Sequence, residues 1–223
     1  QKTLDVIEGM FAIALFDIDD QSISLIRDFA GIKPLFYSYN IGNVVFGSRY
    51  DQVAKHKNSI DNAIDQEVLK TYIKMHYIPA PYGILEDTFQ VYPGEYVNID
   101  SKGKLSKYIY WEFPALSEED LISDKEEALQ FLDSKLKESV KDQLEADVPL
   151  GTFLSGGIDS PLVTTYAKAS KEDLKAFTIG SDSKIHDESE DAKIYASLIG
   201  VDILLEKMVA SNAKKILKDC MRN

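Results

Sequence analysis

The sequence predicts a chain of two parts, an α+β part built on an antiparallel sheet and an α/β part built on a parallel sheet. In the first part, short apolar runs are separated by short polar links, which is the spacing of hairpins. From Leu150 onward, apolar runs alternate with segments of helical periodicity, which favours parallel strands joined by helices. Residues 114–124 between the parts are acidic and irregular. We therefore expect domains over 1–113 and 125–223, with a linker over 114–124.

The elements of the first part follow from its apolar runs and turn residues. One helix is expected over Asp65–His76, where apolar residues recur at helical spacing, and Pro79 and Pro81 should end it. Strands are expected over residues 10–17, 22–27, 35–39, 44–48, 92–100 and 105–111. The pair Arg27 and Asp28 is interpreted as framing a turn that packs the sheet.

The second part is expected to begin with a helix that carries one apolar stripe from Ala128 to Leu144. Ser123 and Glu126 have the spacing of a capping box at its start. Beyond it, strands are expected over 150–154, 174–180 and 201–207, and helices over 159–168, 188–199 and 211–221. The run before Ser155 has the composition of a buried strand, and Asp187 is the expected N-cap of the helix that follows the second of these strands.

Composition limits the function classes. The 223 residues are 44% hydrophobic, as expected for a globular body with a core, and carry a formal net charge of −12. That charge, without a basic cluster, argues against nucleic acid and anionic membrane surfaces as partners. Cys220 is the single cysteine, so an intrachain disulfide is excluded and the cytoplasm is the expected location. No apolar run approaches the ~18 residues of a spanning helix.

The stretch FLSGGIDS, residues 153–160, is the strongest functional signal. Gly156 and Gly157 have no Cβ, so a ligand can approach the main chain closely. Ser155 and Ser160 supply hydroxyl donors, and the start of the following helix supplies unpaired amides. Ligands of α/β sheets bind beyond the carboxyl ends of strands, which is where this loop should lie. The loop therefore suits a pyrophosphate.

Asp159 indicates which form of phosphate is bound. A carboxylate repels phosphate unless a cation lies between them, so Asp159 favours a Mg²⁺-nucleotide complex and is the candidate metal ligand. The loop is not of the Walker type, because it lacks a Gly-Lys-Ser/Thr ending.

The loop resembles the pyrophosphate-binding loop of the ATP pyrophosphatases, and the longer string from Asp147 to Val163 is similar to the asparagine synthetase family. The first part supports the same family. Its matching strings are EGMFAIALFD, RDFAGIKPLFY, VFGSRYDQV, YIPAPYGILEDTFQVYPGEYV and the pair Tyr110-Trp111, which look like the later half of a glutaminase domain. Downstream, AFTIG and HDESEDA resemble the family's next strand and helix start. The resemblance runs through nearly the whole chain in the family's order.

The resemblance implies an N-terminal-nucleophile glutaminase domain followed by an ATP-pyrophosphatase domain of the adenine nucleotide α-hydrolase-like type. It implies a glutamine-hydrolysing enzyme that makes asparagine from aspartate and glutamine through a β-aspartyl-AMP intermediate. ATP and Mg²⁺ are then the cofactors, aspartate and glutamine the substrates, and a homodimer is allowed. The implied nucleotide-binding residues are Phe153, Leu154, Ser155, Gly156, Gly157, Asp159, Ser160 and Ile179.

Two departures from the family limit this transfer. The family's glutaminase nucleophile is an amino-terminal cysteine, which this chain, starting at Gln1, does not contain, and Cys220 does not replace it. The family's second signature and its catalytic lysine are expected beyond residue 223. We therefore expect the catalytic residues to lie outside this chain, and the isolated chain to be inactive. Pro161 and the pair Val201-Asp202 also differ from the family's usual residues.

Several alternatives stay open. The glycine loop can be a turn without a ligand, Phe153 and Ile179 can be core residues instead of the lining of an adenine pocket, and Asp187 with Glu188 can be a solvated helix start. The parent protein can act on another carboxylate, as a β-lactam synthetase or a peptide or sugar amidotransferase does. It can also be a non-catalytic binding module that keeps the fold.

Overall fold

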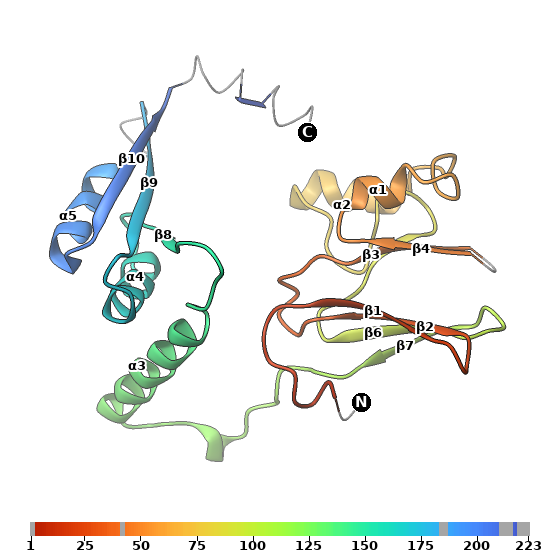
Figure 1. Ribbon diagram of the computed structural model, residues 1–223, viewed down its shortest axis with the longest axis horizontal. Helices are drawn as coiled ribbons and strands as arrows, with labels where there is room; N and C mark the ends of the chain where they lie inside the picture. The colour runs from red at the N-terminus through yellow and green to blue at the C-terminus, as the bar shows by residue number, and fades with distance from the viewer. Residues whose placement is uncertain (1–2, 41–42, 183–186, 210–215, 218–223) are drawn as a thin grey trace. The chain divides into compact units, whose positions relative to one another are not determined.

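A computed structural model describes residues 3–40, 43–182, 187–209 and 216–217 of the chain. The chain divides into two compact units, Gln1–Ala115 and Leu116–Asn223 (Figure 1). Each unit has its own sheet system and its own buried cluster, so each is described by itself.

The first unit contains two antiparallel sheets. The four-stranded sheet has the order β1-β2-β6-β7 and the three-stranded sheet has the order β4-β3-β5. The strands are β1 (Ala12–Asp17), β2 (Ser22–Arg27), β3 (Phe36–Asn40), β4 (Asn43–Gly47), β5 (Thr88–Gln90), β6 (Glu95–Ile99) and β7 (Leu105–Ile109). β1 with β2, β3 with β4, and β6 with β7 form hairpins, as the short polar links predict.

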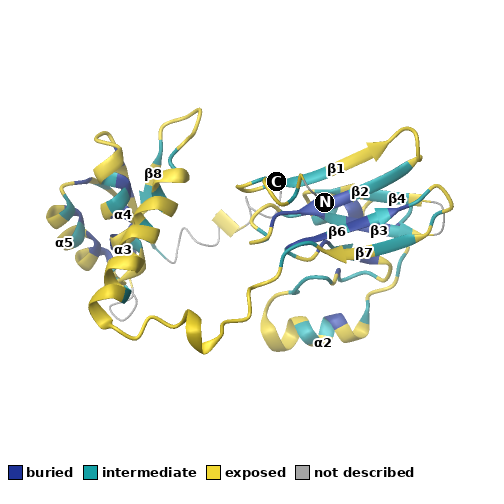
Figure 2. Ribbon diagram, turned by 90° about the horizontal axis from the view of Figure 1, so that it is seen from below, coloured by how far each residue is buried: buried dark blue, intermediate teal, exposed yellow. Residues whose placement is uncertain are grey.

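One apolar cluster joins the two sheets of this unit. It contains Leu25 and Val97 from the four-stranded sheet, Tyr37 from the three-stranded sheet, and Val91 between β5 and β6. All four side chains are fully buried, and Figure 2 shows the buried residues concentrated on the central strands. The first unit is therefore held by side chains that alternate inward from both sheets.

Arg27 and Asp28 organise the turn that follows β2, as the sequence interpretation expects. The Arg27 guanidinium donates to the carbonyl oxygens of Gly31, Lys33 and Val91 at 2.5–2.9 Å. The Asp28 carboxylate accepts from the Lys33 amide at 2.9 Å. Both side chains are buried, so these contacts replace the water that the charges lose.

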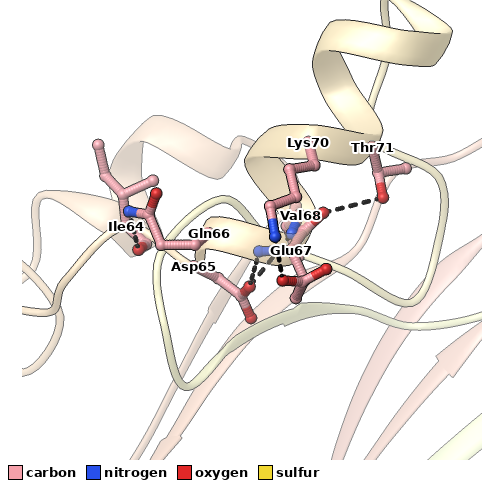
Figure 3. A network of polar contacts seen from close by, with 7 residues as sticks. All are labelled: Ile64, Asp65, Gln66, Glu67, Val68, Lys70 and Thr71. Carbon is pink, nitrogen blue, oxygen red and sulfur yellow. Dashed lines mark hydrogen bonds and ion pairs between the residues drawn. The ribbon is translucent and has the colours of Figure 1, made fainter.

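Two short helices complete the first unit, α1 (Tyr50–Ala54) and α2 (Gln66–Met75). Figure 3 shows how α2 begins: the Asp65 carboxylate accepts hydrogen bonds from the amides of Glu67 and Val68 at 2.9 and 3.1 Å. Helix α2 ends at His76, whose φ of 62° is left-handed, so the helix stops before Pro79 is reached.

The second unit has a three-stranded parallel sheet with the order β10-β9-β8, which confirms the expected strand and helix alternation. Its elements are η1 (Glu118–Asp120), α3 (Lys125–Asp142), β8 (Gly151–Phe153), α4 (Asp159–Ser170), β9 (Lys175–Ser181), α5 (Ser189–Ile199) and β10 (Asp202–Met208). Ala167 of α4 and Ala192 of α5 belong to the same buried cluster as Ala176 of β9. Both helices therefore cover the same face of the sheet.

Four local expectations need correction. Helix α3 is capped by Asp124, whose carboxylate accepts from the Glu127 amide at 2.9 Å, and not by Ser123. Glu188 and not Asp187 is the N-cap of α5. The expected strand over 150–154 shortens to Gly151–Phe153, and it is not buried throughout, because Phe153 is 80% exposed. Phe153 lies on the edge strand of the sheet, and its ring lies beside Phe177 in the hollow on the face opposite the helices.

The helix expected over 211–221 lies outside the described residues except for positions 216–217, which are helical. His186 and Cys220 also lie outside them. Among the described residues, none of the helices combines the length and the apolar character that crossing a membrane requires.

The buried tyrosine of β3 gives a test of the first unit's core. Within the described residues the Tyr37 hydroxyl is buried and makes no hydrogen bond, and burial raises its pKa, as does the nearby charge of Glu95. Removing an unpaired buried hydroxyl removes a desolvation cost, so we expect Tyr37→Phe to leave the free energy of unfolding unchanged or to raise it by about 1 kcal/mol.

Tyr110→Phe is the matched control in chemical denaturation. The Tyr110 hydroxyl donates to the Arg27 carbonyl at 2.7 Å, so its removal should lower the free energy of unfolding by about 1 kcal/mol. A loss of stability in Tyr37→Phe equal to that in Tyr110→Phe would show that the Tyr37 hydroxyl has a partner after all.

Candidate functional site

The SGGIDS loop lies between the carboxyl end of β8 and the start of α4. Leu154 anchors it, because its side chain is buried in the core of the second unit and its amide donates to the Phe177 carbonyl at 2.9 Å. The next residues leave the sheet, and the chain turns directly into α4 at Asp159. The loop therefore has a fixed position at the carboxyl end of a parallel strand, where ligands of α/β sheets bind.

The two serines of the loop contact each other. The Ser155 and Ser160 hydroxyl oxygens lie 2.8 Å apart, and the Ser160 hydroxyl oxygen also accepts from the Ser155 amide at 2.9 Å. The structure therefore brings together two predicted site residues that are five positions apart. Their hydrogen bonds hold the turn together.

The start of α4 has unpaired amides of the kind that bind anions. Among the described residues, the amides of Asp159 and Ser160 have no hydrogen-bond partner, as expected in the first turn of a helix. Helix α4 has 12 residues, so its dipole adds positive potential at the same place. Pro161 follows in the first turn, where its missing amide removes no helical hydrogen bond.

The two glycines have different surroundings. A Cβ at Gly157 would meet nothing closer than the Ser155 hydroxyl oxygen at 3.5 Å, so its side of the loop is open. A Cβ at Gly156 would lie 3.0 Å from the Cβ of Asp191 and 3.3 Å from that of Glu188. The open space beside Gly157 is consistent with the predicted approach of a phosphate. At Gly156, the absence of a side chain also leaves room for the first turn of α5.

Asp159 is exposed at the first position of α4. In the described part of the chain, no group of three or more His, Cys, Asp or Glu side chains is arranged to hold a metal ion. A single carboxylate still fits Mg²⁺, which commonly binds through one or two carboxylates together with the phosphates of a nucleotide. Asp159 therefore remains the predicted metal ligand.

A hollow of about 680 Å³ lies on the sheet face that the helices leave uncovered. In β9, the side chains of Phe177 and Ile179 are exposed on this face, whereas Ala176 belongs to the buried cluster that the sheet shares with the helices. The hollow is lined by Phe153, Phe177, Thr178, Ile179, Leu204, Leu205 and Glu206. Its size and apolar lining suit a planar ring such as a nucleobase.

The two residues that are predicted to line an adenine pocket, Phe153 and Ile179, are not part of the core. Phe153 is 80% and Ile179 is 62% exposed, and both line the hollow. Leu154 has its side chain in the core, so only its main chain is accessible for the predicted nucleotide contact. Sequence reasoning missed Phe177 and Leu204, which the pairing of the parallel strands places in one row with Phe153: Phe153 pairs with Phe177, and Phe177 pairs with Leu204.

Asp187 connects β9 to the start of α5. Its carboxylate accepts from the amides of Ser189 and Ser181 at 3.2 and 3.3 Å. A hydrogen bond from the Ser189 hydroxyl is the main cause that lowers the pKa of Asp187; the two amides and the charge of Lys207 act in the same direction, and desolvation opposes them. These contacts favour the solvated helix start over a metal site for this residue.

Ser189→Ala should raise the pKa of Asp187 toward its ordinary value, because the strongest hydrogen bond to the charged form is lost. A carboxyl group whose pKa is lower in the folded state than in the unfolded state stabilises the fold at pH values above its ordinary pKa. This stabilisation is lost as the pH falls through the folded-state pKa. Carbon-detected NMR titration of the carboxyl group measures the shift, with Ser197→Ala of the same helix as control. An unchanged Asp187 pKa in Ser189→Ala would contradict this assignment.

Gly156→Ala should lower the free energy of unfolding by about 1 kcal/mol, because its Cβ would crowd the first turn of α5. Gly157→Ala is the matched control, since the space beside it is open, and it should change stability less. Chemical denaturation of both variants measures the difference, and equal effects would show that α5 does not pack against Gly156.

Comparisons with known proteins extend over both units. Residues 1–111 match the family model described as glutamine amidotransferase domain, and residues 132–222 match the model described as asparagine synthase. The chain is 31% identical over 206 residues to asparagine synthetase [glutamine-hydrolyzing] 1 of Bacillus subtilis, covering 91% of this chain and 31% of that protein.

It is 33% identical over 193 residues to putative asparagine synthetase [glutamine-hydrolyzing] 2 of Methanocaldococcus jannaschii, covering 83% of this chain and 36% of that protein. The chain thus spans about a third of the length of these relatives. Among solved structures, a glutamine-dependent NAD+ synthetase from Acinetobacter baumannii is 13% identical, with a TM-score of 0.35 over 97% of this chain and 54% of that chain.

Proposed function

Because the chain belongs to the glutamine-hydrolysing asparagine synthetase family, we propose that the whole protein makes asparagine from aspartate, with ATP as the energy source and glutamine as the nitrogen donor. The observation that carries the proposal is the SGGIDS loop at the start of α4, where the amides of Asp159 and Ser160 are without partners in the described structure. Unpaired amides at a helix start are the donors that bind phosphate groups.

The reaction needs these donors because a carboxylate is a poor electrophile. Transfer of AMP to the aspartate side chain turns one carboxylate oxygen into a leaving group and releases diphosphate. Amides and hydroxyls aimed at the departing diphosphate stabilise the negative charge that grows in the transition state, which lowers the barrier more than it strengthens substrate binding. In this proposal, the Ser155 and Ser160 hydroxyls and the start of α4 have that role.

The other predicted site residues bind and orient the nucleotide. Phe153 and Ile179 would contact the base through the hollow on the open face of the sheet. The Asp159 carboxylate would hold Mg²⁺, which neutralises phosphate charge when it is bound. Ammonia released from glutamine in the amidotransferase domain would attack the activated β-carboxyl carbon and displace AMP. Shielding ammonia from bulk water would keep it unprotonated.

Asp159→Asn tests the proposal. Exchange of labelled diphosphate into ATP, measured on the full-length protein with aspartate present, should fall by about 100-fold because the variant loses the charge that holds the cation beside the phosphates. Asp173→Asn, an exposed aspartate between α4 and β9, is the matched control and should leave the exchange unchanged. Full exchange by Asp159→Asn would remove Asp159 from the proposed site.

The same assay separates the remaining functions. Exchange that depends on an acid other than aspartate would indicate a related enzyme acting on another carboxylate. The absence of exchange, together with no heat of ATP binding in the presence of Mg²⁺, would indicate a non-catalytic module. The inactivity of the 223-residue chain alone, the cytoplasmic location and the homodimer stay predictions.

A further inference from the structure

The Gly156 amide already has an anionic partner in the chain itself. It donates to a carboxylate oxygen of Glu188 at 3.1 Å, and the two residues are 32 positions apart. Glu188 is the N-cap residue of α5, but its side chain makes no capping hydrogen bond with its own helix. Its carboxylate is instead directed at the loop that the proposed function assigns to diphosphate.

The packing of α5 makes this contact close. An added Cβ on Gly156 would lie 3.2 Å from an Asp191 carboxylate oxygen and 3.3 Å from the Glu188 Cβ. The absence of a side chain at Gly156 therefore lets the first turn of α5 approach the loop. Because this turn packs directly on the loop, the Glu188 side chain at the start of α5 lies close enough to accept from the Gly156 amide.

A carboxylate and a phosphate use the same kind of donor. Both are anions that accept hydrogen bonds from backbone amides, and one N–H points well at one acceptor at a time. The other two amides at this end of the loop have acceptors within it: that of Ser155 bonds the Ser160 hydroxyl at 2.9 Å, and that of Gly157 bonds the Ser155 hydroxyl at 3.3 Å. A diphosphate that takes the Gly156 amide must therefore displace Glu188 and tolerate its charge nearby.

We infer that Glu188 lowers the affinity of the loop for the released product, because its carboxylate competes with diphosphate for the Gly156 amide. The inference rests on the proposed function, because it takes the SGGIDS loop as the diphosphate site. Its effect is that the Gly156 amide regains the Glu188 carboxylate as its acceptor when diphosphate leaves. Weak product binding favours release, which is the step that often limits turnover.

The expected magnitude is modest because Glu188 is exposed. Exposed charge interactions are screened by water, so their removal changes affinity less than the loss of a buried contact does. We expect Glu188→Gln to tighten diphosphate binding about threefold, the order of an exposed charge contact worth a fraction of a kcal/mol. Glu188→Ala, which removes the acceptor as well as the charge, should tighten binding at least as much.

The control is Glu190→Gln. Glu190 lies on the same first turn of α5 and its substitution changes the net charge equally, but its carboxylate pairs with Lys193 at 2.7 Å and not with the loop. An effect through overall charge would appear in Glu190→Gln to the same extent. An effect through the Gly156 amide would appear only in the two Glu188 variants.

The test is isothermal titration of the full-length protein and the three variants with sodium diphosphate in the presence of Mg²⁺, the cation that the proposed site holds beside the phosphates, after thermal unfolding has shown that each variant folds. Tighter binding by both Glu188 variants, with Glu190→Gln like the wild type, supports the inference. Equal or weaker binding by the Glu188 variants overturns it and leaves the proposed function intact, because the loop still binds diphosphate. No binding by any of the four proteins overturns both.

Discussion

The close packing of α4 and α5 on one face of the β8, β9 and β10 sheet is the constraint on which the second unit depends. The contact is made by small side chains, with Ala176 on the sheet, Ala167 on α4 and Ala192 and Ala196 on α5. Small residues let the helix axes approach the strands, and a larger side chain at any of these buried positions would force the layers apart. The same approach brings the start of α5 against the loop at the start of α4.

This packing gives the two faces of the sheet different surroundings: one is buried against the helices and the other is open. The face toward the helices contains the buried cluster with Leu154 and Val201, and it fixes the strands. The opposite face shows Phe153, Phe177 and Ile179 around the hollow. A parallel strand that is buried on both faces would show no such difference, so the alternation along β9 is what distinguishes structural positions from positions available to a ligand.

The first unit depends on a different kind of interaction. Its two antiparallel sheets share an apolar cluster, and the buried guanidinium of Arg27 connects the turn after β2 to the segment between β5 and β6 through main-chain carbonyl oxygens. A buried cation is stable there only because three carbonyl groups and the neighbouring Asp28 replace its hydration. Arg27 is therefore a structural residue, although a charged cluster in a sequence also suggests a site.

The sequence alone predicted most of the strands and helices, and the position of the SGGIDS loop between a strand and a helix, because hydrophobic periodicity, glycine and proline act locally. It missed the short helix α1 (Tyr50–Ala54) and the three-residue strand β5 (Thr88–Gln90). It misplaced the caps of α3 and α5 by one residue, since Ser123 and Asp124, or Asp187 and Glu188, are adjacent residues that can both cap. Only the tertiary structure decided that Phe153 lies on an open face and that Glu188 reaches Gly156. Both depend on which elements pack together across long stretches of sequence, and side-chain patterns within one segment do not contain that information.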